Sequence, residues 1–258
     1  MTIPASLVEK IAAAKSVTVL TGAGVSAESG VPTFRDAQTG LWAKYSPEDL
    51  ATPRAFLRNP RLVWEWYEWR RKLVAEAKPN PAHLALAEME SLFPAFNLVT
   101  QNVDGLHQRA GSRNVIELHG NIMRTKCYDD NVVVSKWDDT GDVPPRCPLC
   151  GGRLRPDVVW FEEPLPEAAL KTASNAARNC QLFLSVGTST LVYPAAGLPS
   201  EALRCGATVV EINPCQTPFT CMATFVLADA AGIALPRLVE ALKTARKFSG
   251  KQGPQAQG

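Results

Sequence analysis

Short apolar runs separated by helical patterns constrain the fold of this chain more than any other feature of its sequence. The runs lie at residues 17–20, 96–100, 115–118, 182–186, 208–212 and 225–228. Most of them do not alternate with polar residues, which is typical of strands buried on both faces of a sheet. Helical patterns lie at 166–178, 194–204 and 236–246, and a further helix with a capping box from Ser6 to Glu9 opens the chain. This alternation predicts an α/β fold with a doubly wound parallel sheet.

Two stretches interrupt the alternation and predict a second, smaller domain. Residues 36–94 contain no convincing strand but at least two helices, each beginning at an Asn-Pro pair, at 59–60 and 80–81. Residues 121–154 are polar and carry a C-x-x-C pair, as in a small metal-stabilised module. We therefore assign 1–35, 95–120 and 155–246 to the large domain, 36–94 to a helical module, 121–154 to a cysteine module and 247–258 to a disordered tail.

The composition predicts a globular protein with an ordinary core. Hydrophobic residues make up 46% and charged residues 20%, and 27 Lys+Arg against 25 Asp+Glu give a net charge of +2. So small a charge argues against a nucleic-acid-binding surface, and no apolar run approaches the length of a membrane span. The first residues lack the basic and apolar regions of a secretory signal. We expect a cytoplasmic, monomeric enzyme or binding protein with no nucleic-acid or membrane partner.

A glycine-rich segment, Gly22-Ala-Gly-Val-Ser-Ala27, follows the first apolar run directly and matches the pattern G-x-G-x-x-A. Small residues at this spacing let backbone N–H groups approach a pyrophosphate, and a strand followed by such a turn begins a Rossmann-like dinucleotide-binding unit. A tight turn that binds no ligand is the alternative. The acidic residue expected about 20 positions later is missing. The pattern therefore indicates a dinucleotide used for something other than ordinary hydride transfer.

Polar side chains stand at the ends of four further runs, where ligand crevices open in a doubly wound sheet. The residues at these ends are Gln101, Asn102, Asp104, His119, Thr188, Ser189 and Asn213, together with Gly187, which supplies only backbone groups. A polar turn with an Asx cap competes as an interpretation for the amides and the carboxylate. His119 lies beside a glycine and is a candidate general base, with a purely structural role equally supported.

These elements together resemble the sirtuins, the NAD-dependent protein-lysine deacylases. The matching motifs are GAGVSAESGVPTFR at 22–35, TQNVDGLHQRAG at 100–111, LHG at 118–120, RPDVVWF at 155–161, GTS at 187–189 and IN at 212–213. The resemblance runs from about residue 20 to residue 236. It implies a Rossmann-like NAD-binding domain and a small domain built from a helical module and a zinc-binding module.

The resemblance also implies roles for individual residues. Around the pyrophosphate and in the loop over the nicotinamide ribose it places Gly22, Ala23, Gly24, Ala27, Pro32, Thr33, Phe34 and Arg35. In the ribose and nicotinamide pocket it places Gln101, Asn102 and Asp104, which act in catalysis with His119 as general base. At the adenosine half it places Gly187, Thr188, Ser189, Asn213, Pro214, Cys215 and Ala231.

The implied reaction moves an acyl group from a protein lysine to ADP-ribose derived from NAD. The acyl amide oxygen attacks the ribose carbon as nicotinamide leaves, and His119 then helps deprotonate a ribose hydroxyl that attacks the alkylimidate. The products are lysine, nicotinamide and 2′-O-acyl-ADP-ribose. Two alternatives stay open: a protein ADP-ribosyltransferase, and a non-catalytic sensor that binds NAD or ADP-ribose.

The helix after Asn59 carries the candidate determinant of the acyl group. Its apolar stripe is formed by Leu62, Trp66, Trp69 and Leu73, and Tyr67 and Arg70 project together on a neighbouring flank. By themselves these two residues indicate a buried tyrosine beside a surface arginine. The pair nevertheless resembles the Tyr-x-x-Arg of class III sirtuins, which prefer succinyl, malonyl and glutaryl lysine to acetyl lysine. The further substrate-binding residues that the resemblance implies are Ala51, Val158, Trp160 and Phe161.

The sequence departs from the family pattern at two places. Sirtuins usually carry two C-x-x-C pairs for zinc, and here Cys147 and Cys150 are intact while the first pair reads Cys127-Tyr-Asp-Asp130. Zinc accepts carboxylate oxygen, so we expect one structural zinc with three thiolates and Asp130, and loss of the zinc is the alternative. Glu162 stands where the family has glycine, which reduces backbone freedom and adds a negative charge beside the peptide groove. This charge predicts a preference for basic residues next to the target lysine.

Overall fold

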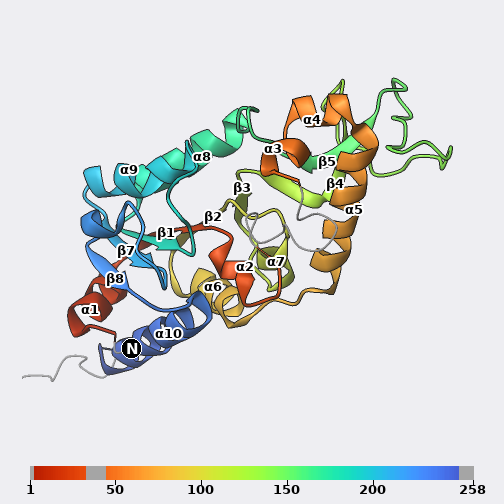
Figure 1. Ribbon diagram of the computed structural model, residues 1–258. Coiled ribbons are helices and arrows are strands. Elements are labelled where there is room, and N and C mark those ends of the chain that lie inside the picture. The colour runs from red at the N-terminus through yellow and green to blue at the C-terminus, as the bar shows by residue number, and fades with distance from the viewer. Residues whose placement is uncertain (1–2, 33–44, 250–258) are drawn as a thin grey trace, which may run out of the picture.

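The computed structural model describes residues 3–32 and 45–249 of the chain. These residues form a six-stranded sheet covered by helices and, at the other end of the molecule, a two-stranded sheet with further helices beside it (Figure 1). The strands are β1 (Ser16–Thr21), β2 (Ala95–Thr100), β3 (Val115–Glu117), β4 (Gly120–Cys127), β5 (Leu154–Val158), β6 (Leu182–Val186), β7 (Thr208–Ile212) and β8 (Phe225–Leu227). The α-helices are α1 (Ala5–Ala13), α2 (Gly24–Ala27), α3 (Pro47–Leu50), α4 (Pro53–Arg58), α5 (Pro60–Glu76), α6 (Pro81–Leu92), α7 (Leu106–Arg109), α8 (Glu167–Asn179), α9 (Leu198–Arg204) and α10 (Ala231–Ser249).

The large sheet is parallel throughout and has the strand order β3-β2-β1-β6-β7-β8. Counted by its own strands, this order is 3-2-1-4-5-6, that of a doubly wound dinucleotide-binding sheet. Every apolar run singled out in the sequence is a strand, so the predicted fold class is confirmed. Strands β1, β2 and β3 are added toward one edge of the sheet, and β6, β7 and β8 are added toward the other edge. The switch point of the topology lies between β1 and β6. The carboxyl ends of these two strands are therefore the place where a ligand crevice is expected.

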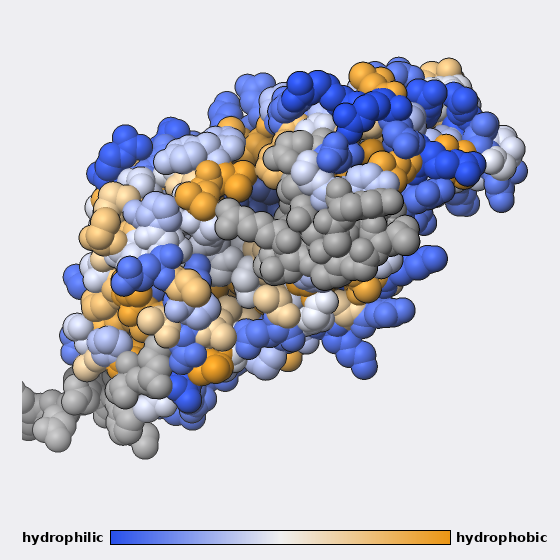
Figure 2. Space-filling model, in the orientation of Figure 1, coloured by the Kyte–Doolittle hydropathy of each residue, from blue (hydrophilic) through white to orange (hydrophobic). Residues whose placement is uncertain are grey.

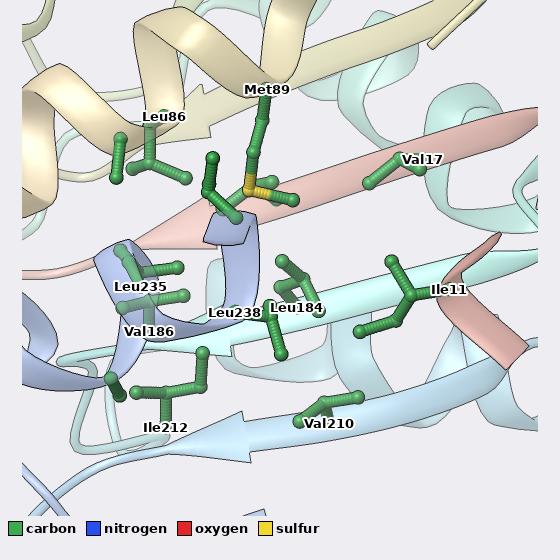
Figure 3. Packing of buried hydrophobic residues seen from close by; sticks show 14 of the residues in the cluster. Ile11, Val17, Leu86, Met89, Leu184, Val186, Val210, Ile212, Leu235 and Leu238 are labelled. Atoms are coloured by element: carbon green, nitrogen blue, oxygen red, sulfur yellow. The ribbon is translucent and has the colours of Figure 1, made fainter. Parts of the chain in front are cut away.

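Apolar side chains from both faces of this sheet are buried by helices, which explains why the runs do not alternate. On one face Leu86 and Met89 of α6, Leu235 and Leu238 of α10 and Ile11 of α1 meet strand residues such as Val17, Leu184, Val186, Val210 and Ile212 (Figure 3). On the other face α8 and α9 pack against Leu20, Phe183 and Val209. Each buried Leu, Ile or Met contributes roughly 1.5–3 kcal/mol relative to an exposed one, so both layers stabilise the six-stranded sheet.

The smaller lobe joins β4 and β5, which are antiparallel, to helices α3, α4 and α5 (Figure 1). Its core contains Phe56, Val63, Tyr67, Ile122 and Trp160 among other residues. Helix α6, which the sequence analysis groups with the helical module at 36–94, packs on the six-stranded sheet instead. The reason is the buried stripe Ala82, Ala85, Leu86 and Met89, which faces α10 and β1.

Two predicted helix starts are wrong. Helix α1 begins at Ala5 after Pro4, whose carbonyl accepts the N–H of Leu7 and of Val8, so Ser6 lies inside the first turn and caps nothing. Helix α10 begins at Ala231 and contains Pro236 in its interior. Burial of Ala231, Ala234 and Leu235 in the core outweighs the one backbone hydrogen bond that a proline removes. The predicted tail begins too early, because α10 continues to Ser249, and the remainder of 247–258 lies outside the described residues.

The face of the molecule seen in Figure 2 is mixed in polarity. Hydrophilic residues dominate the end that carries α4 and α5, with apolar residues in small patches among them (Figure 2). Within 3–32 and 45–249, no helix combines the length and the apolarity that crossing a membrane requires.

Candidate active site

Two glycine turns meet at the carboxyl ends of β1 and β6. The N–H of Gly22 donates to the carbonyl of Val186 over 3.0 Å, and the N–H of Gly24 donates to that of Gly187 over 2.8 Å. A Cβ on Gly22 would lie 2.8 Å from the oxygen of Gly187, and a Cβ on Gly187 would lie 2.6 Å from the nitrogen of Val25. The glycines of the G-x-G-x-x-A segment are therefore required first by the packing of the two turns on each other. Five of its six backbone N–H groups, those of Gly22, Gly24, Val25, Ser26 and Ala27, already donate to carbonyl oxygens within the protein.

Polar side chains from the neighbouring strand ends tie these turns together. Gln101 Nε2 donates to Thr188 Oγ1 over 2.9 Å, and Asn213 Nδ2 donates to the Thr188 carbonyl over 3.0 Å. Asn102 Nδ2 donates to the Gly22 carbonyl over 3.0 Å. Residues that follow β1, β2, β6 and β7 thus converge, as the sequence predicts for the mouth of a doubly wound sheet.

A buried serine, Ser26, joins three of the polar residues near β2 and was not singled out in the sequence. Its hydroxyl donates to Asp104 Oδ2 over 2.7 Å and accepts from Asn102 Nδ2 over 3.0 Å. His83 Nε2 lies 3.4 Å from the same oxygen, and Asp104 Oδ1 accepts the N–H of Leu106 over 2.9 Å. Two hydrogen bonds therefore hold each of the side chains of Asn102 and Asp104. The only sequence signal for Ser26 is its place inside the glycine-rich segment.

His107, to which the sequence assigns no role, is also part of this buried network. Its Nε2 lies 2.9 Å from Thr21 Oγ1, which itself donates to Thr100 Oγ1 over 2.8 Å. The imidazole rings of His83 and His107 are 4.8 Å apart. Burial and the neighbouring His83 lower the pKa of His107 to about 3, so this ring is neutral under ordinary conditions.

His119 lies between β3 and β4, beside the same strand ends. Its Nδ1 is 2.9 Å from the carbonyl oxygen of Gln101. A carbonyl only accepts, so Nδ1 carries the proton and Nε2 holds the free electron pair. Burial lowers the pKa of His119 below its usual 6.5, although the hydrogen bond to Gln101 opposes the shift. The predicted general base is thus a neutral imidazole with a fixed tautomer.

The remaining predicted NAD-binding residues lie around this mouth or outside the described part. Ala231 opens α10, and the next N–H, of Gly232, donates to the carboxylate of Glu28 over 2.7 Å, which joins α10 to the end of α2. Ala23, Ala27, Ser189, Pro214 and Cys215 are exposed, and Pro32 is half-buried. Thr33, Phe34 and Arg35 lie outside the described residues.

Tyr67 and Arg70 occupy the buried face of α5, and the predicted stripe is only partly correct. The exposed fraction is 1% for Tyr67 and 8% for Arg70, whereas Leu62, Trp69 and Leu73 are half-buried. The buried face differs from the predicted stripe because α5 packs against β4, β5 and the core of the small lobe. The face in this contact carries Val63, Trp66, Tyr67, Arg70 and Val74.

The predicted acyl-pocket residues gather around Tyr67. Ala51, Val158 and Trp160 belong to the same buried cluster, and the N–H of Phe161 donates to the Ala51 carbonyl over 3.0 Å. Burial raises the pKa of Tyr67 to about 12 and lowers that of Arg70, because desolvation disfavours each charged form. The site therefore presents a neutral phenol beside a buried guanidinium.

Three cysteines and one aspartate form a separate cluster between β4 and β5. The ligand atoms of Cys127, Asp130, Cys147 and Cys150 all lie within 4.8 Å of one another. Zinc–sulfur bonds of about 2.3 Å in a tetrahedron separate the ligand atoms by nearly 4 Å, so the four groups fit one zinc ion. A turn closed by the N–H of Gly151 to the Cys147 carbonyl holds the C-x-x-C pair. The predicted ligands thus come together, with Asp130 in the position of the fourth thiolate.

Comparison with known proteins agrees with this geometry. The Sir2 family model matches residues 22–194. An NAD-dependent protein deacylase of Aquifex aeolicus is 52% identical over 229 residues, which cover 88% of this chain and 95% of the relative. The chain belongs to the Sir2 family.

Solved sirtuin structures have the same fold. A crystal structure of a Sir2 homologue in complex with NAD is 45% identical, covers 95% of each chain and gives a TM-score of 0.88. A Sir2 complex with a p53 peptide and NAD is 30% identical, covers 97% of this chain and 100% of that one, and gives a TM-score of 0.79. The arrangement described above is therefore that of a sirtuin.

In this sirtuin Glu162 adopts a backbone conformation that favours glycine. It lies in a turn closed by the N–H of Glu163 to the carbonyl of Trp160 over 3.1 Å, and its φ is 73°. Its carboxylate pairs with Arg54. The negative charge that Glu162 adds to the predicted peptide groove is thus partly balanced by a neighbouring cation.

Proposed function

We propose that this NAD-dependent protein deacylase prefers lysines that carry succinyl or malonyl groups, with glutaryl also accepted and acetyl removed more slowly. The observation that supports this preference is the burial of Tyr67 and Arg70 side by side on α5, beside Ala51, Val158 and Trp160. Apolar walls suit the methylene groups of such an acyl chain. A guanidinium and a phenol at their end suit its carboxylate, which an arginine can bind through two hydrogen bonds.

Electrostatics favour an anionic acyl group at Arg70. Desolvation lowers the pKa of this arginine, and the neighbouring Tyr67 and Asp104 only partly oppose the shift. A buried cation is stabilised when an anion enters its neighbourhood, because the interaction is poorly screened there. An acetyl group brings no charge, so it gains nothing from Arg70. This difference is the physical basis of the proposed preference.

The turns at β1 and β6 would receive NAD across the switch point of the sheet. The residues proposed for the pyrophosphate, the nicotinamide ribose and the adenosine are those that the resemblance to sirtuins implies. Because the N–H groups of Gly22 and Gly24 are engaged, Ala23 is the member of that turn that we expect to donate to the pyrophosphate. His119 would accept a ribose proton at Nε2, since Gln101 keeps the other ring nitrogen protonated. Asn102 and Asp104 are held by Ser26 and would orient the ribose.

The proposed products are free lysine, nicotinamide and 2′-O-acyl-ADP-ribose. The substrate is an acylated protein or peptide, which would add as a strand beside Phe161. We further propose that Cys127, Asp130, Cys147 and Cys150 hold one structural zinc. Such an ion would fix β4 and β5 against each other and take no part in the chemistry. Cytoplasmic location and a monomeric state stay predictions of the sequence.

The test compares two peptides and three variants. Arg70→Met and Tyr67→Phe each remove one polar group of the proposed carboxylate site, and Lys72→Met removes an exposed cation of the same helix as a matched control. Initial rates with NAD are measured by mass spectrometry on succinyl-lysine and acetyl-lysine forms of one peptide. We expect Arg70→Met to lower the succinyl-to-acetyl ratio of kcat/KM by at least about 30-fold, as for loss of one partner of a buried charge pair. An unchanged ratio in Arg70→Met would remove the proposal.

A further inference from the structure

The indole of Trp160 is hydrogen-bonded to the phenol of Tyr67. Nε1 of Trp160 donates to the Tyr67 hydroxyl oxygen over 3.0 Å, and the exposed fractions are 2% and 1%. An indole nitrogen only donates, so the phenol oxygen is the acceptor in this bond. Within the described part of the chain, the Tyr67 hydroxyl accepts this bond and no hydrogen bond from it to a protein acceptor is present.

This bond fixes what the phenol can offer to a ligand. A hydroxyl has one proton and two acceptor positions, and one acceptor position faces Trp160. The proton therefore points away from the indole. It stays in place at neutral pH, because burial raises the pKa of Tyr67 to about 12. Toward a group that only accepts, such as a carboxylate, Tyr67 is accordingly a donor.

Trp160 itself is held on two sides. The guanidinium carbon of Arg155 lies 3.3 Å from the centroid of the indole ring. Arg155 in turn binds both carboxylate oxygens of Glu163, over 2.5 and 2.8 Å, and Glu163 accepts the backbone N–H of Trp160 over 2.8 Å. The indole also packs against the ring of Phe56, whose centroid is 5.2 Å away. The direction of the Nε1–H bond is thereby set by the protein.

We propose that Trp160 is a positioning residue for acyl specificity: its Nε1–H orients the Tyr67 hydroxyl so that the phenol donates to the carboxylate of an acidic acyl group. This inference rests on the proposed function and adds a residue that acts through Tyr67 rather than on the reacting atoms. In this proposal Trp160 and Tyr67 together supply a hydrogen-bond donor of fixed direction to the carboxylate, and Arg70 supplies the positive charge. An acetyl group has no carboxylate and gains nothing from the directed proton.

The test uses the full chain with Trp160→Phe, which keeps an aromatic ring and removes the N–H. Trp64→Phe is the control, because Trp64 is a buried tryptophan of α5 that packs in the cluster with Cys127 and Cys147 instead. The remaining proteins are the wild type, Tyr67→Phe and the double variant Tyr67→Phe/Trp160→Phe. Each is assayed with NAD on peptides carrying succinyl-lysine, acetyl-lysine and the terminal carboxamide of succinyl-lysine.

We expect Trp160→Phe to lower the succinyl-to-acetyl ratio of kcat/KM about fivefold, mostly through KM, which corresponds to about 1 kcal/mol. The carboxamide peptide should lose less than the succinyl peptide. The double variant should show the same ratio as Tyr67→Phe, since the indole acts only through the phenol, and Trp64→Phe should keep the wild-type ratio.

Two results would overturn the inference while leaving the acyl preference intact. One is an unchanged ratio in Trp160→Phe, and the other is a double variant whose loss is the product of the two single losses. If the wild type itself does not favour succinyl over acetyl, the proposed function fails, and the inference fails with it. Should Trp160→Phe not fold, benzothienylalanine at position 160 keeps the shape of the ring, lacks the N–H, and must give the same fivefold loss.

Discussion

His119 Nδ1 lies 2.9 Å from the backbone carbonyl oxygen of Gln101, and this contact fixes the tautomer of the imidazole. Gln101 also donates from its side chain to Thr188, so one residue connects His119 to the turn after β6. The position of the base is thereby set by the same strand ends that would hold the dinucleotide.

The first prediction concerns the pH dependence of turnover. Burial lowers the pKa of His119, and a base must be unprotonated to accept a proton. We expect kcat/KM to rise with pH through a midpoint below 6.5 and to be flat above it. His119→Asn should lose about 10²- to 10⁴-fold in kcat, the usual contribution of a general base. A midpoint above 7 in the wild type, or a variant with normal turnover, would contradict the assigned role.

The second prediction concerns stability and His107. Its pKa is about 3 in the folded chain and near 6.5 when unfolded, so between these values the unfolded state binds more protons. The free energy of unfolding should therefore rise with pH across this window, by up to about 1.4 kcal/mol per pH unit for this group. Urea unfolding at pH 4.5, 5.5 and 6.5 measures the slope. His107→Gln should be less steep than the wild type, and equal slopes would argue against a neutral buried imidazole.

The third prediction concerns the cysteine cluster. Metal analysis should find one zinc per chain in the wild type and none in Cys150→Ser, which should also melt at a lower temperature. Asp130→Cys creates a site with four thiolates and should retain its zinc at higher chelator concentrations than the wild type. Wild-type protein that folds normally without any zinc would show that the cluster has lost the metal.

The fourth prediction concerns the turn at Glu162. A non-glycine residue with φ near 73° costs about 1 kcal/mol, and the exposed pair with Arg54 recovers little of it. In an Arg54→Met background, which removes the ion pair, Glu162→Gly should raise the free energy of unfolding by about 1 kcal/mol. Glu162→Ala keeps the backbone strain and should not. Equal values for the glycine and alanine variants would exclude strain at this position.

The large sheet could be predicted from the sequence because its strands are buried on both faces, and such burial leaves unalternated apolar runs. The position of the candidate site could be predicted for a related reason. Polar residues that directly follow buried parallel strands all lie at the carboxyl edge of the sheet. Periodicity alone predicts the buried face of α5 only in part, because Trp66 is buried but Leu62, Trp69 and Leu73 are half-buried. The tryptophans suggested a stripe through Leu62 and Trp69, whereas packing against β4 and β5 buries Tyr67 and Arg70.

Contacts between residues far apart in the chain could not be predicted from the sequence, because they produce no periodic pattern. Ser26, His83 and Asp104 come together from three elements far apart in the chain, and none of them follows a periodic spacing. The bond from Trp160 to Tyr67 is of the same kind. The sequence places the start of α10 at Pro236, because proline is common in the first turn of a helix. The helix begins earlier, at Ala231, because the residues before the proline are buried in the core.

The most direct test of the account is a competition experiment with the wild-type protein. Equimolar succinyl-lysine and acetyl-lysine peptides of one sequence are incubated with NAD, and both products and nicotinamide are followed by mass spectrometry. A buried arginine and an oriented phenol predict that the succinyl peptide is consumed faster by at least about tenfold, equivalent to 1.4 kcal/mol. Acetyl removal at an equal or greater rate would contradict the account.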